Sequence, residues 1–276
     1  YYIVAVPTPH NNNTKGVELN HLFIAIDKIL EVCFDSSIII IESTIPPGTI
    51  ESYILPTIRK HNKVKKAKIE VVHAPERVLP GNAFKEIINN SRTIGAKSKK
   101  LRKKVGMLYK EITKGEIILT DIKIAEMSKV IENSFRAVNI AFANELAKIS
   151  HKASINVYEL ISICNKHPRV NILNPGPGVG GHCIPVDPWF LTVEYPLESN
   201  LIRESMKVNE SMTEFVYLRL QEILKENQLS YDIKIGIYGL SYKPNVDDHR
   251  NSPSLELIQK LRGEKYSHIY SFDPMI

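Results

Sequence analysis

Cysteine is scarce in this sequence, and long hydrophobic runs are absent. The 276 residues include three cysteines, Cys33, Cys164 and Cys183, which are too few and too far apart for a disulfide framework or a zinc knuckle. No uncharged apolar run approaches the roughly 18 residues of a membrane-spanning helix, and the N-terminus has no basic segment followed by an apolar stretch and a cleavage site. We therefore expect a protein of the reducing cytoplasm, with no membrane span and no metal site.

Positive charge is in excess, but it is concentrated in two places. The net charge is +6, and residues 59–68 and 97–104 each hold six Lys or Arg and no acidic residue. The rest of the chain is mildly acidic. Basic runs of this kind can bind nucleic acid, but neither contains interleaved aromatic residues or a nucleic-acid motif. We expect solvated surfaces and no nucleic-acid partner, with nucleic-acid binding as the minor alternative.

Composition and length fit an ordinary globular protein with more than one core. The chain is 43% hydrophobic and 24% charged, and its length favours two domains with part of a third. It opens without Met inside a buried strand pattern, Tyr1–Val6, and stops where another strand pattern ends near residue 272. We therefore expect it to be a fragment, or a sequence shown without its flanking segments.

The order of patterns predicts an α/β fold interrupted by helices. Up to residue 119, short apolar runs such as 37–41 alternate with helical stripes such as 17–33, which indicates a mostly parallel sheet. Residues 121–152 predict one long helix, followed by helices over 156–165 and 199–227. A strand over 232–238, a helix near 254–262 and a strand near 270 begin a second α/β unit. The expected domains are 1–119, 120–229 and 230–276.

The loop 174–188 is rich in glycine and proline and carries Cys183, with Asp187 four residues later. Glycines let a backbone approach a ligand and expose amide donors, so an accessible thiol here has what a nucleophile needs. The alternative is a small buried residue beside a tight turn, and we weigh the two equally. Cys33 and Cys164 lie in helical patterns and are expected to be structural.

Polar residues also mark the long helix and three strand ends. Polar side chains recur along the long helix at Glu126, Lys129, Asn133, Arg136 and Asn144, and the middle three share one helical face. Such a stripe is usually solvated, but inside a protein it indicates an anionic or hydroxyl-rich partner. Residues 42–49 and 74–81 follow strands, where open α/β sheets bind ligands, although turns and helix caps explain them equally well. Lys243 and Arg250 follow a third strand and suit phosphates. No GxGxxG fingerprint follows a strand pattern, so no visible motif establishes dinucleotide binding.

Six of these segments in this order make the chain resemble the UDP-glucose/GDP-mannose dehydrogenase family over nearly its whole length. The segments are VAVPTP (4–9), ESTIPPGT (42–49), APERVLPG (74–81), EMSKVIENSFRAVNIAFANE (126–145), GPGVGGHCIPVDP (176–188) and GLSYKPNVDDHRNSP (239–253). The resemblance implies a partial N-terminal NAD-binding Rossmann domain, a central helical domain that forms a homodimer through its long helix, and the start of a C-terminal nucleotide-sugar-binding domain.

The family oxidises a nucleotide-sugar alcohol to a carboxylate with two NAD and one water. By resemblance, Cys183 is the nucleophile and forms a thiohemiacetal and then a thioester. Lys129 is expected to exchange a proton with the sugar oxygen, which Asn133 helps to hold. Asp187 is expected to orient the site or act as a base, and Glu76 to assist hydrolysis. The expected substrate contacts are Arg77, Val78, Lys129, Asn133, Arg136, His167, Arg169, Gly180, Tyr242 and Lys243. The expected cofactor contacts are Pro7, Thr44 and Arg250.

The segment Arg77–Gly81 is similar to the branch of the family that oxidises UDP-N-acetyl-D-mannosamine, because Pro80 stands where UDP-glucose enzymes tend to have a second Glu. UDP-glucose, UDP-N-acetylglucosamine and GDP-mannose stay open as substrates. Two further hypotheses are a two-electron dehydrogenase of the hydroxyacid type, which has no nucleophilic cysteine, and an inactive fragment that only dimerises and binds a sugar nucleotide.

Overall fold

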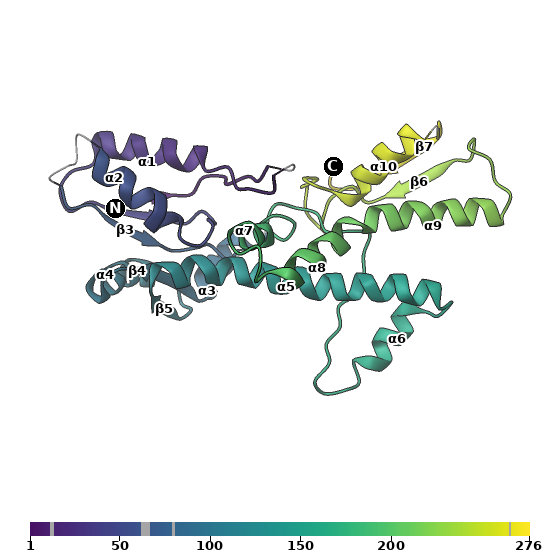
Figure 1. Cartoon of the computed structure of the whole chain (residues 1–276), viewed down its shortest axis with the longest axis horizontal. Coiled ribbons are helices and arrows are strands. Elements are labelled where there is room, and N and C mark those ends of the chain that lie inside the picture. The colour runs from purple at the N-terminus through teal and green to yellow at the C-terminus, as the bar shows by residue number, and fades with distance from the viewer. Residues whose placement is uncertain (12–13, 62–66, 79–80, 265) are drawn as a thin grey trace. The chain divides into compact units, whose positions relative to one another are not determined.

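The computed structural model of the chain (Figure 1) describes residues 1–11, 14–61, 67–78, 81–264 and 266–276. These residues form two compact units. Unit 1 comprises Tyr1–Glu132 with Trp189–Pro196, and unit 2 comprises Asn133–Pro188 with Leu197–Ile276. The domain boundaries expected after residues 119 and 229 remain a prediction.

Unit 1 is built on a five-stranded sheet in the order β1–β2–β3–β4–β5, with strands β1 (Tyr2–Val4), β2 (Ile38–Ile41), β3 (Glu70–His73), β4 (Arg92–Ala96) and β5 (Ile117–Thr120). All neighbouring pairs are parallel except β3 and β4, which are antiparallel. The mostly parallel α/β sheet expected from the alternating pattern is therefore confirmed.

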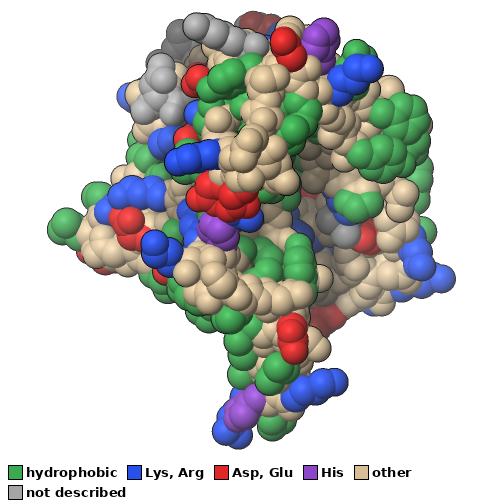
Figure 2. Space-filling model, turned by 90° about the vertical axis from the view of Figure 1, so that its right-hand side faces the viewer, with side chains coloured by type: hydrophobic (Ala, Val, Ile, Leu, Met, Phe, Trp, Pro, Cys, Tyr) green, Lys and Arg blue, Asp and Glu red, His purple; other side chains and the backbone are tan. Residues whose placement is uncertain are grey.

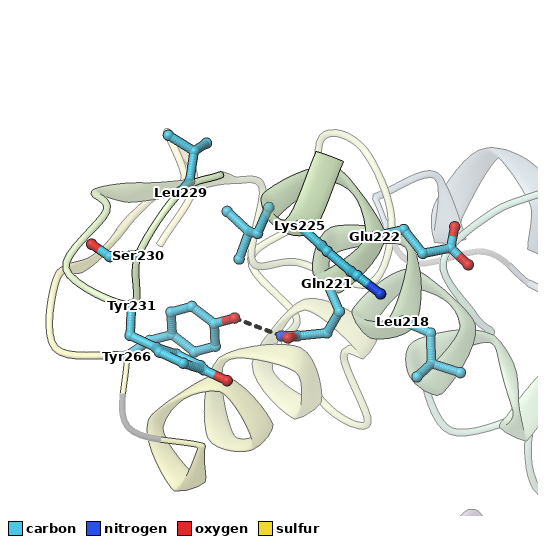
Figure 3. Close-up of a pocket in the computed structure, with 9 residues that line it drawn as sticks. Leu218, Gln221, Glu222, Lys225, Leu229, Ser230, Tyr231 and Tyr266 are labelled. Carbon is cyan, nitrogen blue, oxygen red and sulfur yellow. Dashed lines mark hydrogen bonds between the residues drawn. The ribbon is translucent and has the colours of Figure 1, made fainter. Parts of the chain in front are cut away.

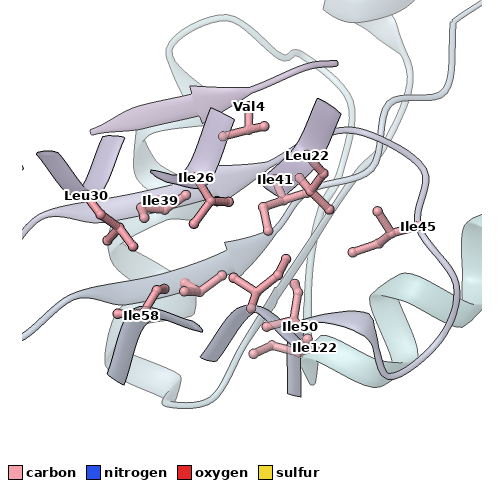
Figure 4. Packing of buried hydrophobic residues seen from close by; sticks show 12 residues of the cluster. Val4, Leu22, Ile26, Leu30, Ile39, Ile41, Ile45, Ile50, Ile58 and Ile122 are labelled. Carbon is pink, nitrogen blue, oxygen red and sulfur yellow. The ribbon is translucent and has the colours of Figure 1, made fainter. Parts of the chain in front are cut away.

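Helices cover both faces of this sheet. They are α1 (Asn20–Val32), a short π-helical turn η1 (Ile50–Ile54), α2 (Leu55–Lys60), α3 (Ala83–Asn89) and α4 (Lys99–Lys110). Ile39 and Ile41 of β2 pack with residues of α1 and η1 in the cluster of Figure 4, whereas Ile38 and Ile40 pack with α4 on the opposite face. The uninterrupted isoleucine run is thus explained by burial on both sides, since alternate side chains of a strand point to opposite faces.

Helix α5 (Ile122–Lys152) starts in unit 1 and continues into unit 2, as the long pattern without glycine or proline predicts. Unit 2 also contains α6 (Val157–Cys164), α8 (Asn200–Glu210), α9 (Met212–Glu226), β6 (Ile235–Tyr238), α10 (Pro253–Gly263) and β7 (Ile269–Phe272). Strands β6 and β7 are parallel. A further helix, α7 (Asp187–Glu194), begins directly after the Cys183 loop.

The expected single helix over 199–227 is two helices that meet at Ser211. The Ser211 hydroxyl donates to the carbonyl of Val208 at 2.7 Å and accepts a hydrogen bond from Lys148 of α5 at 2.6 Å. A serine that bonds the backbone locally competes with regular helix hydrogen bonding, which accounts for the break. Periodicity does not reveal this, because both helices keep a hydrophobic stripe.

Charged side chains of both signs are interspersed with hydrophobic ones on the face of the molecule that Figure 2 presents. Among the described helices, none has the length and hydropathy needed to cross a membrane.

Candidate functional site

In unit 2, the Cys183 side chain is half-buried in the loop that leads into α7. Its carbonyl accepts the backbone N–H groups of Val186 at 3.1 Å and Asp187 at 2.8 Å, so Cys183 stands one turn before the start of the helix. None of the three cysteines, all of which are described, forms a disulfide. Cys183 is therefore a free thiol in a loop, one turn before the first residue of α7.

Helix α5 binds both ends of this loop through buried amide side chains. Asn133 donates to the Asp187 carboxylate at 2.6 Å, and the Asn144 carbonyl accepts the N–H of Gly176 at 2.9 Å. Asn209 of α8 accepts from Asn144 at 2.9 Å and donates to the carbonyl of Ala137 at 3.0 Å. The structure thus brings Asn133 and Asp187 together, and it adds Asn144 and Asn209 as residues that the sequence patterns had not assigned to the site.

The segment 239–253, which follows β6, lies against the same loop. Gly181 donates its N–H to the carbonyl of Arg250, and the Asn251 side chain donates to the carbonyl of Gly181, both at 2.8 Å. A Cβ on Gly180 would lie 2.6 Å from the Cβ of Tyr242, and one on Gly181 would lie 2.9 Å from the Tyr242 ring. The close approach of Tyr242 therefore requires glycine at both positions, whether or not a ligand also approaches the loop.

Charged groups surround this contact. Arg250 pairs with Asp248 at 2.6 Å, and hydrogen bonds from its side chain lower the pKa of Asp248 to about 2. The pKa of Arg250 is raised, chiefly by Asp248 and also by the nearby Cys183. Burial raises the pKa of Tyr242, with contributions from Asp248 and Cys183, while Arg250 and Arg136 act in the opposite direction. Cys183, Tyr242 and Arg250 are therefore electrostatic neighbours.

The other residues predicted for unit 2 lie at its surface. Arg136 is exposed on α5, and Lys243 is half-buried beside Tyr242. His167 and Arg169 are exposed in the turn after α6, where the His167 ring accepts the N–H of Arg169 at 3.3 Å. Within the described part of the chain, no hydrogen bond or ion pair links His167 or Arg169 to Cys183.

In unit 1, the predicted residues Pro7, Thr44 and Glu76 follow three adjacent parallel strands, β1, β2 and β3. The carboxyl ends of parallel strands meet at one edge of a sheet, which is where open α/β sheets bind ligands. Thr8 donates to the carbonyl of Thr44 at 2.7 Å, which ties the first two loops together. This edge fits a cofactor because Thr44 is half-buried and offers a hydroxyl there.

Glu76 belongs to a cluster that the sequence patterns missed. Arg92 of β4, which is 6% exposed, forms ion pairs with both Glu42 and Glu76. Tyr109 of α4 donates to Glu42, and its ring lies 4.6 Å from the Arg92 guanidinium. Burial opposes the charge on Arg92, but the two carboxylates outweigh it and raise its pKa. No sequence signal marks Arg92, because an arginine inside a strand is normally expected at a surface.

Arg77 of the same strand-end loop forms an ion pair with Glu132 of α5 at 2.8 Å, and its carbonyl accepts from Asn90 at 3.0 Å. Val78 is half-buried. Leu79 and Pro80, on which the substrate expectation depends, lie outside the described residues. Lys129 is half-buried on α5, four residues before Asn133 and hence about one turn away along the helix.

Glu126, the first polar residue of the long-helix motif, was given no role from the sequence. It is fully buried and accepts the backbone N–H groups of Gly48 at 2.6 Å and Ile50 at 3.0 Å. Burial raises its pKa to about 7, against the opposing effect of the two hydrogen bonds. Glu126 thereby fastens the loop that follows Thr44 to α5.

Two cavities among the described residues are lined by residues other than the predicted ones. A cavity of about 470 Å³ in unit 2 (Figure 3) lies beside α9 and the Tyr231–Tyr266 ring pair, where Gln221 bonds Tyr266. A cavity of about 420 Å³ in unit 1 is bordered by α1, the Pro46–Thr49 turn and α7. Among the described residues, no group of three His, Cys, Asp or Glu side chains is arranged to hold a metal ion.

Three family models match the chain in order. They are the NAD binding domain (residues 1–113), the central domain (123–211) and the UDP binding domain (236–276) of the UDP-glucose/GDP-mannose dehydrogenase family.

Individual proteins of known type are similar as well. A UDP-N-acetyl-D-mannosamine dehydrogenase of Methanocaldococcus jannaschii is 46% identical over 268 residues, which is 96% of this chain and 60% of that protein. One of Campylobacter jejuni is 41% identical over 282 residues, which is 100% of this chain and 69% of that protein. The solved UDP-D-ManNAc dehydrogenase of Pyrococcus horikoshii matches with a TM-score of 0.91 at 41% identity, over 99% of this chain and 65% of the other. The chain therefore spans about 60–69% of the length of these relatives.

Proposed function

The chain belongs to the UDP-glucose/GDP-mannose dehydrogenase family, and we propose from this that it oxidises UDP-N-acetyl-D-mannosamine to UDP-N-acetyl-D-mannosaminuronate with NAD. The observation that carries the proposal is the environment of Cys183. It is a free thiol in the loop one turn before α7, beside the buried Asn133–Asp187 pair and the Tyr242–Arg250 segment. An accessible cysteine in such surroundings suits a four-electron oxidation, which needs a covalent intermediate.

Cys183 is proposed to carry the sugar through the second oxidation as a covalent intermediate. Bound NAD supplies the hydride acceptor, once for each of the two oxidations. After the first, the Cys183 sulfur adds to the aldehyde carbon, and the carbonyl oxygen takes a proton to give a thiohemiacetal. Loss of a second hydride and a proton leaves a thioester. Water then breaks the carbon–sulfur bond, releasing the carboxylate and the thiol.

Other residues serve this sequence of steps. Lys129 and Asn133, one turn apart on α5, would exchange a proton at the sugar oxygen and stabilise the oxyanion. Asp187, held by Asn133, would orient the site, and Glu76 would assist hydrolysis. Arg77, Val78, Arg136, His167, Arg169, Gly180, Tyr242 and Lys243 are proposed to contact the UDP-sugar. Pro7, Thr44 and Arg250 are proposed to contact NAD.

The amount of NADH formed per sugar nucleotide tests this function. Two NADH per UDP-N-acetyl-D-mannosamine are expected, because the alcohol becomes a carboxylate. Cys183→Ser should abolish the full yield, whereas Cys164→Ser, a cysteine of α6, should leave it unchanged. One NADH per substrate would instead identify a two-electron dehydrogenase, and a normal yield from Cys183→Ser would refute the covalent mechanism.

A panel of UDP-glucose, UDP-N-acetylglucosamine and GDP-mannose tests the choice of sugar. Faster oxidation of any of these would reassign the substrate within the family. Absence of turnover together with retained binding of the sugar nucleotide would support the inactive-fragment alternative.

We further propose a homodimer that forms through α5, three domains bounded after residues 119 and 229, and a cytoplasmic location. The dimer is supported by a row of apolar side chains on α5, each of them 48–68% exposed: Ile124, Ile131, Phe135, Phe142 and Ile149. At about 100° per residue, all five fall within roughly 40° of one another around the helix. A single narrow apolar stripe of this length suits a second copy of the same helix.

A further inference from the structure

The segment 239–253 binds the Cys183 loop through a residue that the proposed chemistry does not use. Asn251 donates its side-chain amide to the carbonyl of Gly181 at 2.8 Å, and the preceding residue, Arg250, accepts the N–H of Gly181 at 2.8 Å. Two consecutive residues of one segment therefore hold both backbone polar groups of Gly181, which lies two residues before Cys183.

The conformation of Asn251 suits this contact. Its φ of 50° is in the left-handed region, which asparagine tolerates better than most residues with a side chain. Asn245 in the same segment has a φ of 60° and is also exposed, but the hydrogen bonds described for the Cys183 loop do not involve its side chain. The two asparagines therefore share a backbone conformation and differ in the contact with Gly181.

The segment is itself held from the opposite side. The buried carboxylate of Asp273, at the end of β7, accepts the N–H groups of Leu240 at 2.6 Å and Ser241 at 2.8 Å, and also the Ser241 hydroxyl at 2.8 Å. These bonds hold the pKa of Asp273 well below its usual range. Residues 239–253 are thus held by Asp273 near their beginning and contact the Cys183 loop near their end.

We propose that Asn251 is a positioning residue for Cys183: it keeps the cysteine loop against residues 239–253, the segment that carries Tyr242 and Arg250. The inference deepens the proposed function, since it concerns the residue proposed as nucleophile. The charges near the thiol include Asp248, which pairs with Arg250, and Arg136, which acts on Tyr242.

Alkylation of Cys183 by two reagents of different charge tests the position of the thiol without cofactor or substrate. Iodoacetate is an anion and is favoured near a guanidinium, whereas iodoacetamide is neutral. A change in access alters both rates alike, so their ratio reports the local charge. Peptide mass spectrometry gives the ratio separately for Cys183 and for Cys33 and Cys164, which serve as references within the same chain.

Asn251→Gly should lower the iodoacetate-to-iodoacetamide ratio at Cys183 by about two- to fivefold, because the thiol moves away from Arg250. Asn245→Gly is the matched control and should leave the ratio unchanged, as should both variants at Cys33 and Cys164. An unchanged ratio at Cys183 in Asn251→Gly would overturn the proposal.

Arg250→Gln identifies the cation. This variant should lower the ratio at Cys183 on its own, and adding Asn251→Gly should lower it no further, since the two residues act through one contact. A further drop of equal size would overturn the proposal, because Asn251 would then act independently of Arg250. A failure of the proposed function would be recognised separately, as absence of NADH formation with the unmodified chain.

Discussion

Arg92 is a buried cation of unit 1 whose charge is balanced by carboxylates. It pairs with two carboxylates, Glu42 and Glu76, in a place where it is 6% exposed. Removing one partner from a buried ion pair leaves an uncompensated charge, which costs far more than a surface pair contributes. The orientation of Glu76, which is proposed to assist hydrolysis, therefore depends on a residue that need not touch the substrate.

Arg92→Met should lower the free energy of unfolding by about 3 kcal/mol, because Glu42 and Glu76, which are half-buried, would lose their cation. Urea denaturation measures this. Arg102→Met provides a comparison in the same unit, since Arg102 pairs with an Asp121 whose side chain is 65% exposed. That change should cost about 1 kcal/mol. Equal losses for the two variants would show that the buried cluster has no special role.

Glu126 should make stability depend on pH near neutrality. Burial raises its pKa from 4.5 to about 7, so between these values the folded chain binds more protons than the unfolded chain. Stability contributed by this group is therefore full below pH 4.5 and is lost as the pH rises to 7 and above, by roughly 2–3 kcal/mol.

Glu126→Gln should flatten the decline in the free energy of unfolding between pH 5 and pH 8, because glutamine does not titrate. Urea denaturation at several pH values measures the slope. Glu31→Gln, at an exposed position of α1, is the control and should leave the slope as it is in the unmodified chain. A decline that persists in Glu126→Gln would assign the pH dependence to another group.

At the scale of elements, the glycine-rich loop and the segment after β6 are fitted to each other. A Cβ on Gly180 would meet Tyr242 at 2.6 Å and the carbonyl of Asn251 at 2.8 Å, whereas one on Gly176 would find its nearest neighbour at 3.9 Å. Backbone atoms cannot move as a flexible side chain can, so a Cβ fits at Gly176 but not at Gly180.

Gly180→Ala should lower the free energy of unfolding by about 1–3 kcal/mol through overpacking, and it should slow NADH formation by displacing the Cys183 loop. Thermal denaturation and the NADH assay measure these effects. Gly176→Ala in the same loop is the control and should change both by much less. If the two variants behaved alike, the close approach of Tyr242 would not be the reason for the glycine.

At the scale of the whole molecule, the exposed apolar row on α5 is what supports the proposed association of two copies of the chain. The apolar row on α5 is exposed in the single chain, and burial of such side chains stabilises by about 25 cal/mol per Å². The first basic run (59–68) lies partly outside the described residues, and in the second run (97–104) Arg102 forms an ion pair with Asp121.

Phe142→Glu should convert a dimer to a monomer, because it places a charge in the middle of the apolar row. Analytical ultracentrifugation measures the mass. Phe84→Glu changes a phenylalanine that is 87% exposed on α3 and should leave the mass unchanged. A monomeric unmodified chain, or a Phe142→Glu variant that still dimerises, would exclude α5 as the interface.

Much of this molecule followed from local patterns. The isoleucine run of β2, the stripe of α1 and the uninterrupted α5 were predictable because burial on a strand or helix imposes a period on the sequence. Cys183, Asn133 and Asp187 were predicted as site residues from ordered motifs, and the structure brings Asn133 and Asp187 together. Helix α7 was not predicted, and neither was the break at Ser211, because each depends on contacts with other elements.

The sequence by itself determined most of the helices and strands and the chemical groups that the chain carries, since both depend on residue type and spacing along the backbone. Only the tertiary structure decided which of these groups meet. It gave Arg92 two carboxylates from different strand ends, buried Glu126 under the turn at Gly48, and set Asn251 against Gly181. Such partners are 16–78 residues apart, and contacts over that distance arise from packing, which no local period records.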